Sequence, residues 1–287
     1  MLSRLANIVL FLSGTAFAQP AVSEDVYKNI LRYTGFAAAA YSDSCATPPS
    51  GSTVVKTFND GSTDTQATLF RDDTAKEIII AFRGSSSPKD LDTDFEFKSV
   101  PLTAVGTSCQ SCKVHSGFQT AYSSIASQII SAVKDELSSS GYYTLTITGH
   151  SLGAGLSSIA TSSFIGSGIK VASTYTYGEP RNGDSAWVSY LGSQIPDDNY
   201  FRVTHYNDGV PQIPPTVLGF EHHGPEYWQS KKSGNSAATT YNCGANSTSC
   251  NAGQDYGDNP INGAHLTYSN TVVAASLHNP SCGYSLL

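Results

Sequence analysis

The pattern of hydrophobic and polar residues predicts an alternation of strands and helices. Residues 77–82 form a nearly continuous apolar run, which is typical of a strand buried on both faces of a sheet. From Phe118 onward, apolar residues recur every three or four positions and predict an amphipathic helix that ends before Gly141. Because such an apolar stripe packs against a sheet, both elements are expected in one layered core.

The alternation continues along the chain. Residues 143–148 are rich in β-branched and aromatic residues and predict a strand, and the small residues of 152–163 predict a helix. Residues 171–177 predict a further strand, which Gly178 and Pro180 end. Strands that alternate with helices imply an α/β fold with a mainly parallel central sheet and helices on both faces. No internal repeat or long linker divides the chain, so a single domain is expected.

The first 18 residues predict a secretory signal peptide. Arg4 precedes an apolar stretch at residues 8–12, and a pattern of small residues ends at Ala18. A run this short cannot span a bilayer, and no stop-transfer segment follows it, so no stable membrane anchor is expected. We therefore expect a secreted, extracellular domain over residues 19–287.

The composition is that of a globular protein. The chain of 287 residues is 39% hydrophobic and 14% charged, which excludes a disordered or collagen-like chain. The 16 Lys and Arg against 23 Asp and Glu give a formal charge of −7. Because phosphate neutralisation needs basic surface, no nucleic-acid partner is expected.

The cysteines predict disulfides and not a metal site. Six cysteines in a secreted chain form up to three pairs, and Cys109 and Cys112 are close enough to pair locally. A zinc site would need a second ligand pair, and Cys243 and Cys250 have the wrong spacing for one. The sequon that begins at Asn246 lies in a polar, Gly-rich segment and predicts exposed N-glycosylation.

One pentapeptide predicts a catalytic serine. Residues 149–153, GHSLG, match the pattern G-x-S-x-G and lie between a predicted strand and a predicted helix. A strained turn there would push the hydroxyl of Ser151 out above the sheet, and the helix N-terminus would favour a negative oxygen beside the N–H of Leu152. A structural Gly-Ser turn is the competing interpretation, and the strand and helix on either side favour the nucleophile.

A serine nucleophile needs an imidazole to take its proton and a carboxylate to orient that imidazole. In this fold the order along the chain is Ser, acid, His. Asp208 follows a predicted strand at residues 200–205 and precedes Gly209, which indicates the catalytic edge of the sheet, and His265 lies in a loop-like segment. The other candidate acids are Asp184, Asp197, Asp198, Asp255 and Asp258, and the other candidate histidines are His222, His223 and His278.

The remaining histidines are expected to have supporting roles. Next to the nucleophile, His150 is expected to support the turn, and His205 to be packed or hydrogen-bonded within its strand. Surface or supporting positions are expected for His222 and His223, because His265 is the better candidate base. No partner can be named for His115.

Five segments occur in a specific order: 81–85 (AFRGS), 148–154 (TGHSLGA), 177–181 (YGEPR), 202–211 (RVTHYNDGVP) and 225–228 (PEYW). In this order they resemble the filamentous-fungal class 3 lipases, a group that includes the Thermomyces-type lipase and the type-A feruloyl esterases. The resemblance covers most of the chain, from about residue 26 to residue 282. It implies an α/β-hydrolase fold with a short lid, a catalytic triad of Ser151, Asp208 and His265, and no metal or organic cofactor.

The same resemblance implies further site residues. It gives Ser85 and Leu152 as the two oxyanion donors, and Val210 and Ile213 as walls of the substrate pocket. It also implies three disulfides: Cys45 with Cys282, Cys109 with Cys112, and Cys243 with Cys250.

Residues 86–95 occupy the position of the lid in these lipases. Charged residues surround Leu91, so strong activation at an oil surface is not expected. The segment around Phe95 resembles the feruloyl esterases, in which an aromatic residue at this position borders the phenolic pocket. Because Phe95 lacks the hydroxyl of the tyrosine found there, discrimination for a phenol is weakened.

These observations favour a fungal lipase or general carboxylesterase that cleaves acyl esters such as acylglycerols. A feruloyl esterase acting on plant cell-wall esters is the alternative, and its disulfide arrangement resembles the one implied here. A secreted binding protein that keeps the fold without turnover is the remote alternative. The expected partner is an ester substrate, including one at an oil–water interface, and the protein is expected to be a monomer.

Overall fold

A central sheet organises the molecule. The computed structural model describes residues 19–42, 44–85, 97–274 and 282. Within these residues an eight-stranded sheet has the order β1-β2-β3-β6-β7-β8-β9-β10. Its strands are β1 (Thr53–Asp60), β2 (Thr65–Asp72), β3 (Glu77–Phe82), β6 (Thr144–His150), β7 (Val171–Tyr177), β8 (Tyr200–His205), β9 (Glu226–Gln229) and β10 (Thr240–Asn242).

The middle of this sheet is parallel. β3, β6, β7, β8 and β9 pair in parallel, whereas β1, β2 and β10 add antiparallel pairs at the two edges. The α/β class with a mainly parallel sheet is therefore confirmed. Two small antiparallel sheets lie outside it, β4 (Ser99–Pro101) with β5 (Lys113–His115), and β11 (Thr267–Tyr268) with β12 (Thr271–Val272).

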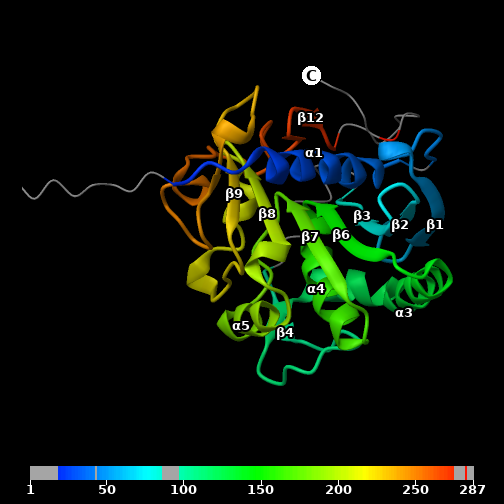
Figure 1. The fold of residues 1–287 in the computed structure, drawn as a ribbon. Coiled ribbons are helices and arrows are strands. Elements are labelled where there is room, and N and C mark those ends of the chain that lie inside the picture. Colours follow the sequence, from blue (N-terminus) through cyan, green and yellow to red (C-terminus); the bar gives the residue numbers. More distant parts are fainter. Residues whose placement is uncertain (1–18, 43, 86–96, 275–281, 283–287) are drawn as a thin grey trace, which may run out of the picture.

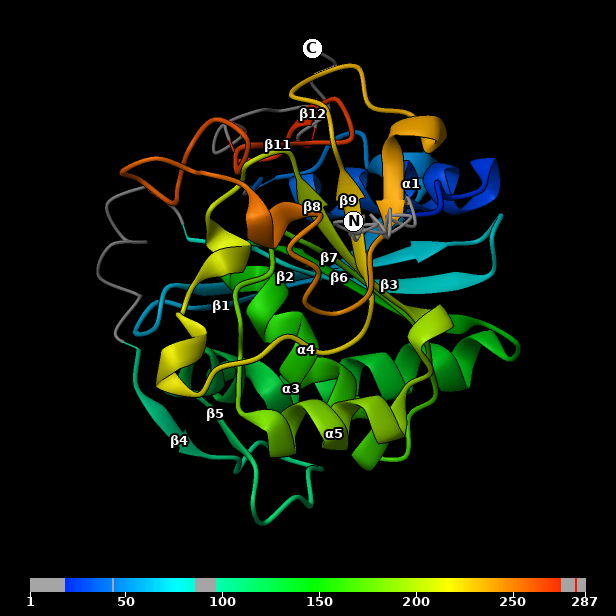
Figure 2. The ribbon, with the colours of Figure 1, turned by 90° about the vertical axis from the view of Figure 1, so that its left-hand side faces the viewer.

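Helices cover both faces of the sheet. α1 (Glu24–Ala39) lies along one face, and α3 (Ser116–Ser140), α4 (Leu152–Gly166) and α5 (Ser185–Gln194) lie along the other (Figures 1 and 2). No helix among the described residues is both long and apolar enough to cross a membrane. Short 3₁₀ turns complete the connections at Pro49–Gly51, Asp197–Asn199, Val210–Gln212, Thr216–Leu218, Ala237–Thr239 and Asn251–Gly253.

The buried parallel strands follow the predicted boundaries closely. All six residues of β3 are buried, as a continuous apolar run predicts, and β7 and β8 have the expected bounds. The strand expected at 143–148 is longer, because β6 continues to His150 and pairs there with Tyr177. This extension carries the strand directly into Ser151.

The hydrophobic pattern did not predict the first helix or the first hairpin. α1 begins after Ser23, whose hydroxyl accepts a hydrogen bond from the Val26 N–H at 3.3 Å, with two acidic residues in its first turn. β1 exposes most of its residues to solvent, so it lacks the apolar run of a buried strand. Its pairing with β2 along seven residue pairs holds it in the sheet.

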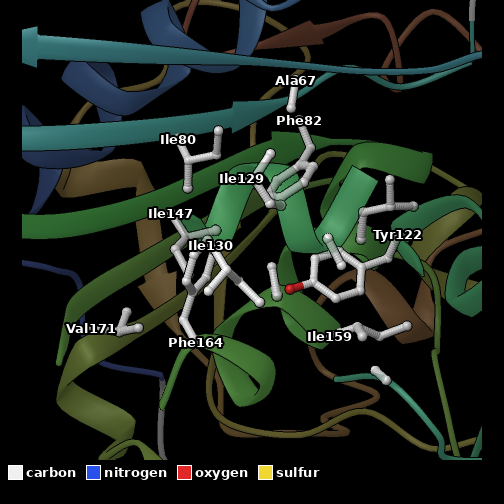
Figure 3. Close-up of a cluster of buried hydrophobic side chains, with 14 of the residues drawn as sticks. Ala67, Ile80, Phe82, Tyr122, Ile129, Ile130, Ile147, Ile159, Phe164 and Val171 are labelled. Atoms are coloured by element: carbon white, nitrogen blue, oxygen red, sulfur yellow. The ribbon is translucent and has the colours of Figure 1, made fainter. Parts of the chain in front are cut away.

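The two faces of the sheet have different cores. The face under α3, α4 and α5, here called the aliphatic face, is dominated by isoleucine, leucine, valine and phenylalanine (Figure 3). The face under α1, here called the tyrosine face, buries Tyr33, Tyr41, Tyr175, Tyr177, Tyr227 and Tyr268.

Three disulfides join the same cysteine pairs that the resemblance implied. Cys45 is bonded to Cys282 across 237 residues, which ties the segment after α1 to the end of the chain. Cys109 is bonded to Cys112 and Cys243 to Cys250, each closing a short loop. Asn246 lies exposed in the second of these loops.

Candidate active site

The turn between β6 and α4 positions Ser151. Its backbone has φ 60° and ψ −126°, an unusual conformation for a residue other than glycine, and its N–H donates to the Tyr177 carbonyl oxygen at 2.9 Å. A Cβ at Gly149 would overlap the carbonyl of Gly153, and a Cβ at Gly153 would overlap the carbonyl of Phe82. The two flanking glycines therefore allow the helix to start immediately against the strand ends.

Ser151, His265 and Asp208 form one hydrogen-bonded line. The Ser151 Oγ lies 2.9 Å from His265 Nε2, and His265 Nδ1 lies 3.0 Å from Asp208 Oδ2 and 3.1 Å from Oδ1. All three residues are at most 1% exposed. Residues 114 positions apart thus meet at the carboxyl ends of the parallel strands.

Two further donors hold the carboxylate of Asp208. The Val210 N–H donates to Oδ1 at 2.9 Å, and the Tyr268 hydroxyl donates to Oδ2. Burial, followed by the charge of Asp208, raises the pKa of Tyr268 well above its usual value, so this hydroxyl keeps its proton. Each carboxylate oxygen of Asp208 therefore has a donor besides the His265 imidazole.

Asn262 shapes the turn that carries His265. Its Oδ1 accepts from the N–H groups of Ala264 at 2.9 Å and His265 at 3.3 Å. Its Nδ2 donates to the Asn207 carbonyl oxygen at 2.7 Å. Since Asn207 directly precedes Asp208, this one side chain connects the turn that carries His265 to the turn that carries Asp208.

Gly178 provides the space in which Asp208 and His265 meet. It has φ 60°, and a Cβ there would lie 2.9 Å from His265 Cε1 and 3.0 Å from Asp208 Oδ2. Any larger residue would press on the His265–Asp208 pair and would strain the backbone.

The two expected oxyanion donors come from neighbouring elements. Leu152 is the first residue of α4, where helix N–H groups have no acceptor within the helix. Ser85 follows β3, and a Cβ at the preceding Gly84 would lie 3.1 Å from the Ser151 Cβ. The backbones of Leu152 and Gly84 therefore lie beside the serine, and the oxyanion roles of Leu152 and Ser85 stay predictions.

A network of buried donors holds the segment of the predicted pocket walls. Val210 is fully buried, and Ile213 is 8% exposed. The Arg181 guanidinium donates to the carbonyl oxygens of Gln212 and Pro214, and the His222 Nε2 donates to the Pro211 carbonyl at 2.6 Å. Burial lowers the pKa of Arg181 to about 10, which leaves it charged at neutral pH.

The roles expected for Leu91, Phe95, Val210 and Ile213 find no support in the cavity beside His265. Leu91 and Phe95 lie outside the described residues. A cavity of about 630 Å³ adjoins the His265 turn, and neither Val210 nor Ile213 is among the residues that line it. The roles of these four residues therefore stay predictions.

Of the surface or supporting positions expected for His222 and His223, the structure shows the supporting ones. His222 and His223 are 4% and 3% exposed, so neither is a surface residue. The His223 Nε2 lies 2.9 Å from the Glu179 carboxylate, in a buried polar cluster of its own. As expected, His205 is hydrogen-bonded at its strand, with Nδ1 2.9 Å from the Ala264 carbonyl oxygen.

The competing acids lie away from the line of hydrogen bonds. Asp184 caps α5 by accepting from the Trp187 N–H, and Asp197, Asp198, Asp255 and Asp258 are exposed. His278 lies outside the described residues. Among the residues that the structure describes, no group of three or more His, Cys, Asp or Glu side chains could hold a metal ion.

Several site residues escaped sequence reasoning. Gly178 was identified only as a residue that ends the strand 171–177 and as part of the YGEPR segment, and Tyr268 was not singled out. Nothing in the local sequence around Tyr41 or Arg181 indicates a contact with the site, because their partners lie far away along the chain.

The chain is similar to known lipases over much of its length. A sequence model described as Lipase (class 3) matches residues 79–218. The secreted mono- and diacylglycerol lipase A of Penicillium cyclopium is 35% identical over 179 residues, which are 62% of this chain and 56% of the relative. A lipase of Rhizomucor miehei is 31% identical over 240 residues, which are 77% of this chain and 63% of the relative. The chain therefore spans less than two thirds of the length of either curated relative.

A solved structure shares the fold along almost the whole chain. The triacylglyceride lipase of Rhizomucor miehei superposes with a TM-score of 0.79 at 27% sequence identity. The superposed region covers 92% of this chain and 100% of the lipase chain. Because this similarity includes the parallel sheet and its flanking helices, the α/β-hydrolase fold is established.

Proposed function

Because the chain belongs to the class 3 lipase family, we propose that it is a secreted serine ester hydrolase that cleaves acylglycerols. The observation that carries the proposal is the line of hydrogen bonds from Asp208 through His265 to Ser151. Its groups are those that acyl transfer requires: a nucleophile, a general base and a carboxylate that orients the base.

The reaction begins at Ser151. As its Oγ attacks the ester carbonyl carbon, His265 Nε2 accepts the hydroxyl proton across the 2.9 Å hydrogen bond. Asp208 holds the Nδ1–H of the ring and stabilises the imidazolium that results. The negative charge that forms on the carbonyl oxygen is stabilised by the N–H groups of Leu152 and Ser85, and one such donor is typically worth about 100- to 1000-fold in turnover.

The intermediate then collapses to an acyl-enzyme. His265 returns the proton to the alcohol oxygen, which leaves as the C–O bond breaks. Water enters, gives a proton to His265 and attacks the acyl carbonyl, and the second collapse releases the carboxylic acid and restores the Ser151 hydroxyl. Over the whole cycle one ester bond is hydrolysed by one water molecule, and both Ser151 and His265 return to their starting protonation states.

Acylglycerols are the substrate class best supported by the comparisons. The relative from Penicillium cyclopium is a mono- and diacylglycerol lipase, and the structural neighbour is a triacylglyceride lipase. Val210 and Ile213 would form the apolar wall against which an acyl chain packs. The feruloyl esterase alternative receives no support from these relatives.

We further propose that the enzyme acts as a monomer at or near an oil–water interface. The 3₁₀ turn Thr216–Leu218 follows the proposed wall segment. Its side chains Val217 and Leu218 are 88% and 52% exposed, which gives this turn an apolar surface that could contact lipid. The charges around Leu91 predict only weak activation there. Rates below and above the solubility limit of one ester, together with a sedimentation measurement of mass, test both parts.

Secretion and glycosylation are proposed together. The signal-like residues 1–18, the three disulfides and the exposed sequon at Asn246 support an extracellular, N-glycosylated enzyme. Removal of N-glycans from the protein secreted by a fungal host should lower its mass. An unchanged mass would contradict occupancy of Asn246.

The substrate proposal is tested by a series of esters. We expect higher kcat/KM on diacylglycerols, triacylglycerols and medium-chain p-nitrophenyl esters than on methyl ferulate. The S151A variant, assayed in parallel, gives the background from contaminating esterases. A preference for methyl ferulate over every fatty ester would overturn the substrate class and leave the hydrolase mechanism intact.

A further inference from the structure

Two buried side chains connect both sides of the proposed catalytic centre without belonging to the triad. Tyr41 lies just after α1, and its hydroxyl is 2.7 Å from Nδ1 of His150, the residue that precedes the nucleophile. The other ring nitrogen of His150, Nε2, is 2.8 Å from the carbonyl oxygen of His265. Both residues are at most 2% exposed, so water does not compete for these bonds.

The chemistry of the partners fixes the direction of these hydrogen bonds. A carbonyl oxygen only accepts, so Nε2 of His150 carries a hydrogen and donates it to His265. Burial, followed by the charge of His265, lowers the pKa of His150 well below its usual value, so the ring is neutral. Its Nδ1 therefore has a lone pair, and the Tyr41 hydroxyl donates to it.

The Tyr41 hydroxyl also reaches the opposite side of the site. It accepts a hydrogen bond from the backbone N–H of Gly84, which precedes the expected oxyanion donor Ser85. A Cβ at Gly84 would overlap this hydroxyl, so glycine is needed for the approach. The bonds run in one chain from the Gly84 N–H through Tyr41 and His150 to the backbone of the base.

The His150 ring also packs directly on the base. The ring centroids of His150 and His265 are 4.6 Å apart, at an interplanar angle of 31°. The Tyr268 ring, whose hydroxyl holds Asp208, contacts the same His150 ring with centroids 5.7 Å apart. Rotation of the His150 ring would therefore disturb the base as well as the hydrogen-bond chain.

We propose that Tyr41 and His150 are positioning residues that keep the imidazole of His265 and the oxyanion backbone at Gly84 and Ser85 in one fixed relation. The Tyr41 hydroxyl selects the His150 tautomer that donates to His265. In the other tautomer, a lone pair on Nε2 would face the His265 carbonyl oxygen, and the repulsion would displace the base. This role rests on the proposed function, because it assumes that His265 is the base.

The direct test removes the Tyr41 hydroxyl. We expect Y41F to lower kcat on a soluble p-nitrophenyl ester by about 10-fold with KM changed less than twofold, since small displacements of catalytic groups affect the chemical step. The rate of inactivation by a fluorophosphonate should fall with kcat, because the same base activates Ser151.

The matched control is Y27F. The Tyr27 hydroxyl is buried and donates to the Asn235 carbonyl at 2.6 Å, far along the chain and away from the triad. Both variants lose one buried hydroxyl, so a comparable loss of thermal stability is expected, whereas only Y41F should lose kcat. A Y41F enzyme with the kcat of Y27F would overturn the proposal.

The second test separates the two bonds of His150. H150Q keeps an amide near the position of Nε2 that can donate to the His265 carbonyl, whereas H150A keeps neither bond. We expect kcat to fall about 100-fold in H150A and about 10-fold in H150Q, a partial rescue that a packing role would not produce. Equal kcat losses in the two folded variants would contradict the proposal. Failure of the proposed function would differ from both outcomes, because the unmodified enzyme itself would lack ester turnover.

Discussion

The two faces of the central sheet use different interactions for different tasks. On the aliphatic face, apolar side chains of the sheet and of α3 and α4 pack together, among them Ile80, Ile129 and Phe164 (Figure 3). On the tyrosine face, hydroxyls make directed bonds: Tyr33 to Glu77, Tyr177 to the Ile30 carbonyl, and Tyr268 to Asp208. Apolar burial has no direction, whereas a hydrogen bond fixes distance and angle. The comparison indicates that the aliphatic face mainly stabilises the fold, whereas the tyrosine face also holds Asp208 of the proposed catalytic site through Tyr268.

The largest effect is expected at Asp208, the carboxylate that contacts both Tyr268 and His265. D208N should lower kcat by about 10⁴-fold, because an amide cannot hold the Nδ1–H tautomer of His265 as a carboxylate does. The measurement is kcat on p-nitrophenyl butyrate, with S151A as the background. A D208N enzyme within tenfold of the unmodified rate would reassign the acid and remove the functional role of the Tyr268 bond.

The second-largest effect is expected for I129A, which should change stability and leave kcat unchanged. Ile129 is fully buried on the aliphatic face, so I129A should lower the free energy of unfolding by about 3 kcal/mol through lost burial and a residual cavity. Urea unfolding measures the loss. The kcat of the folded fraction should stay within twofold, and a tenfold fall would show that this face also positions the site.

The third effect is a dependence of stability on pH. His115, which caps the N-terminus of α3 and stacks on Phe118, has its pKa lowered to about 4 by burial. In the unfolded chain this side chain takes up a proton below about pH 6.5, whereas in the folded chain it does so only near pH 4. The unfolded state therefore binds more protons between these values, and the stability present above pH 6.5 is lost as the pH falls.

H115N isolates this contribution. Asparagine keeps an acceptor for the Phe118 N–H and does not titrate. Between pH 7 and pH 5, urea unfolding should show a loss of stability about 2 kcal/mol smaller in H115N than in the unmodified protein. Identical losses in the two proteins would mean that His115 takes up its proton equally in both states.

The smallest of the four effects is expected at Tyr268. Y268F removes one of the donors to Asp208 and should lower kcat by about 10-fold with little change in KM, a cost near that of one hydrogen bond to a charged group. Y27F again supplies the control for a lost buried hydroxyl. If both variants keep the unmodified kcat, the tyrosine face contributes stability only.

Sequence patterns predict the parallel core well for a physical reason. β3, β7 and β8 are covered on both faces, so each shows a short run of mostly buried residues that turn residues end. The edge strand β1 is mostly exposed and is held by pairing with β2, which leaves no apolar pattern to read. The G-x-S-x-G turn was predictable because strand, glycines and helix are all local.

The contacts that surround the triad were not predictable in this way. The Tyr268 hydroxyl meets a carboxylate 60 residues away, and the Tyr41 hydroxyl meets an imidazole 109 residues away. Such pairs depend on how the sheet brings loops together, and no local periodicity encodes them. The candidates Asp208 and His265 could be chosen from their loop positions and the family resemblance, whereas the residues that hold them required the three-dimensional structure.

The central claim is that the Ser151 hydroxyl is activated by His265 and Asp208. Reaction with a fluorophosphonate followed by peptide mass spectrometry tests it most directly. One adduct on the peptide that contains Ser151 is predicted, with labelling at least 100-fold slower in D208N and absent in S151A. An adduct on another serine, or no adduct on an enzyme that still hydrolyses esters, would contradict the account.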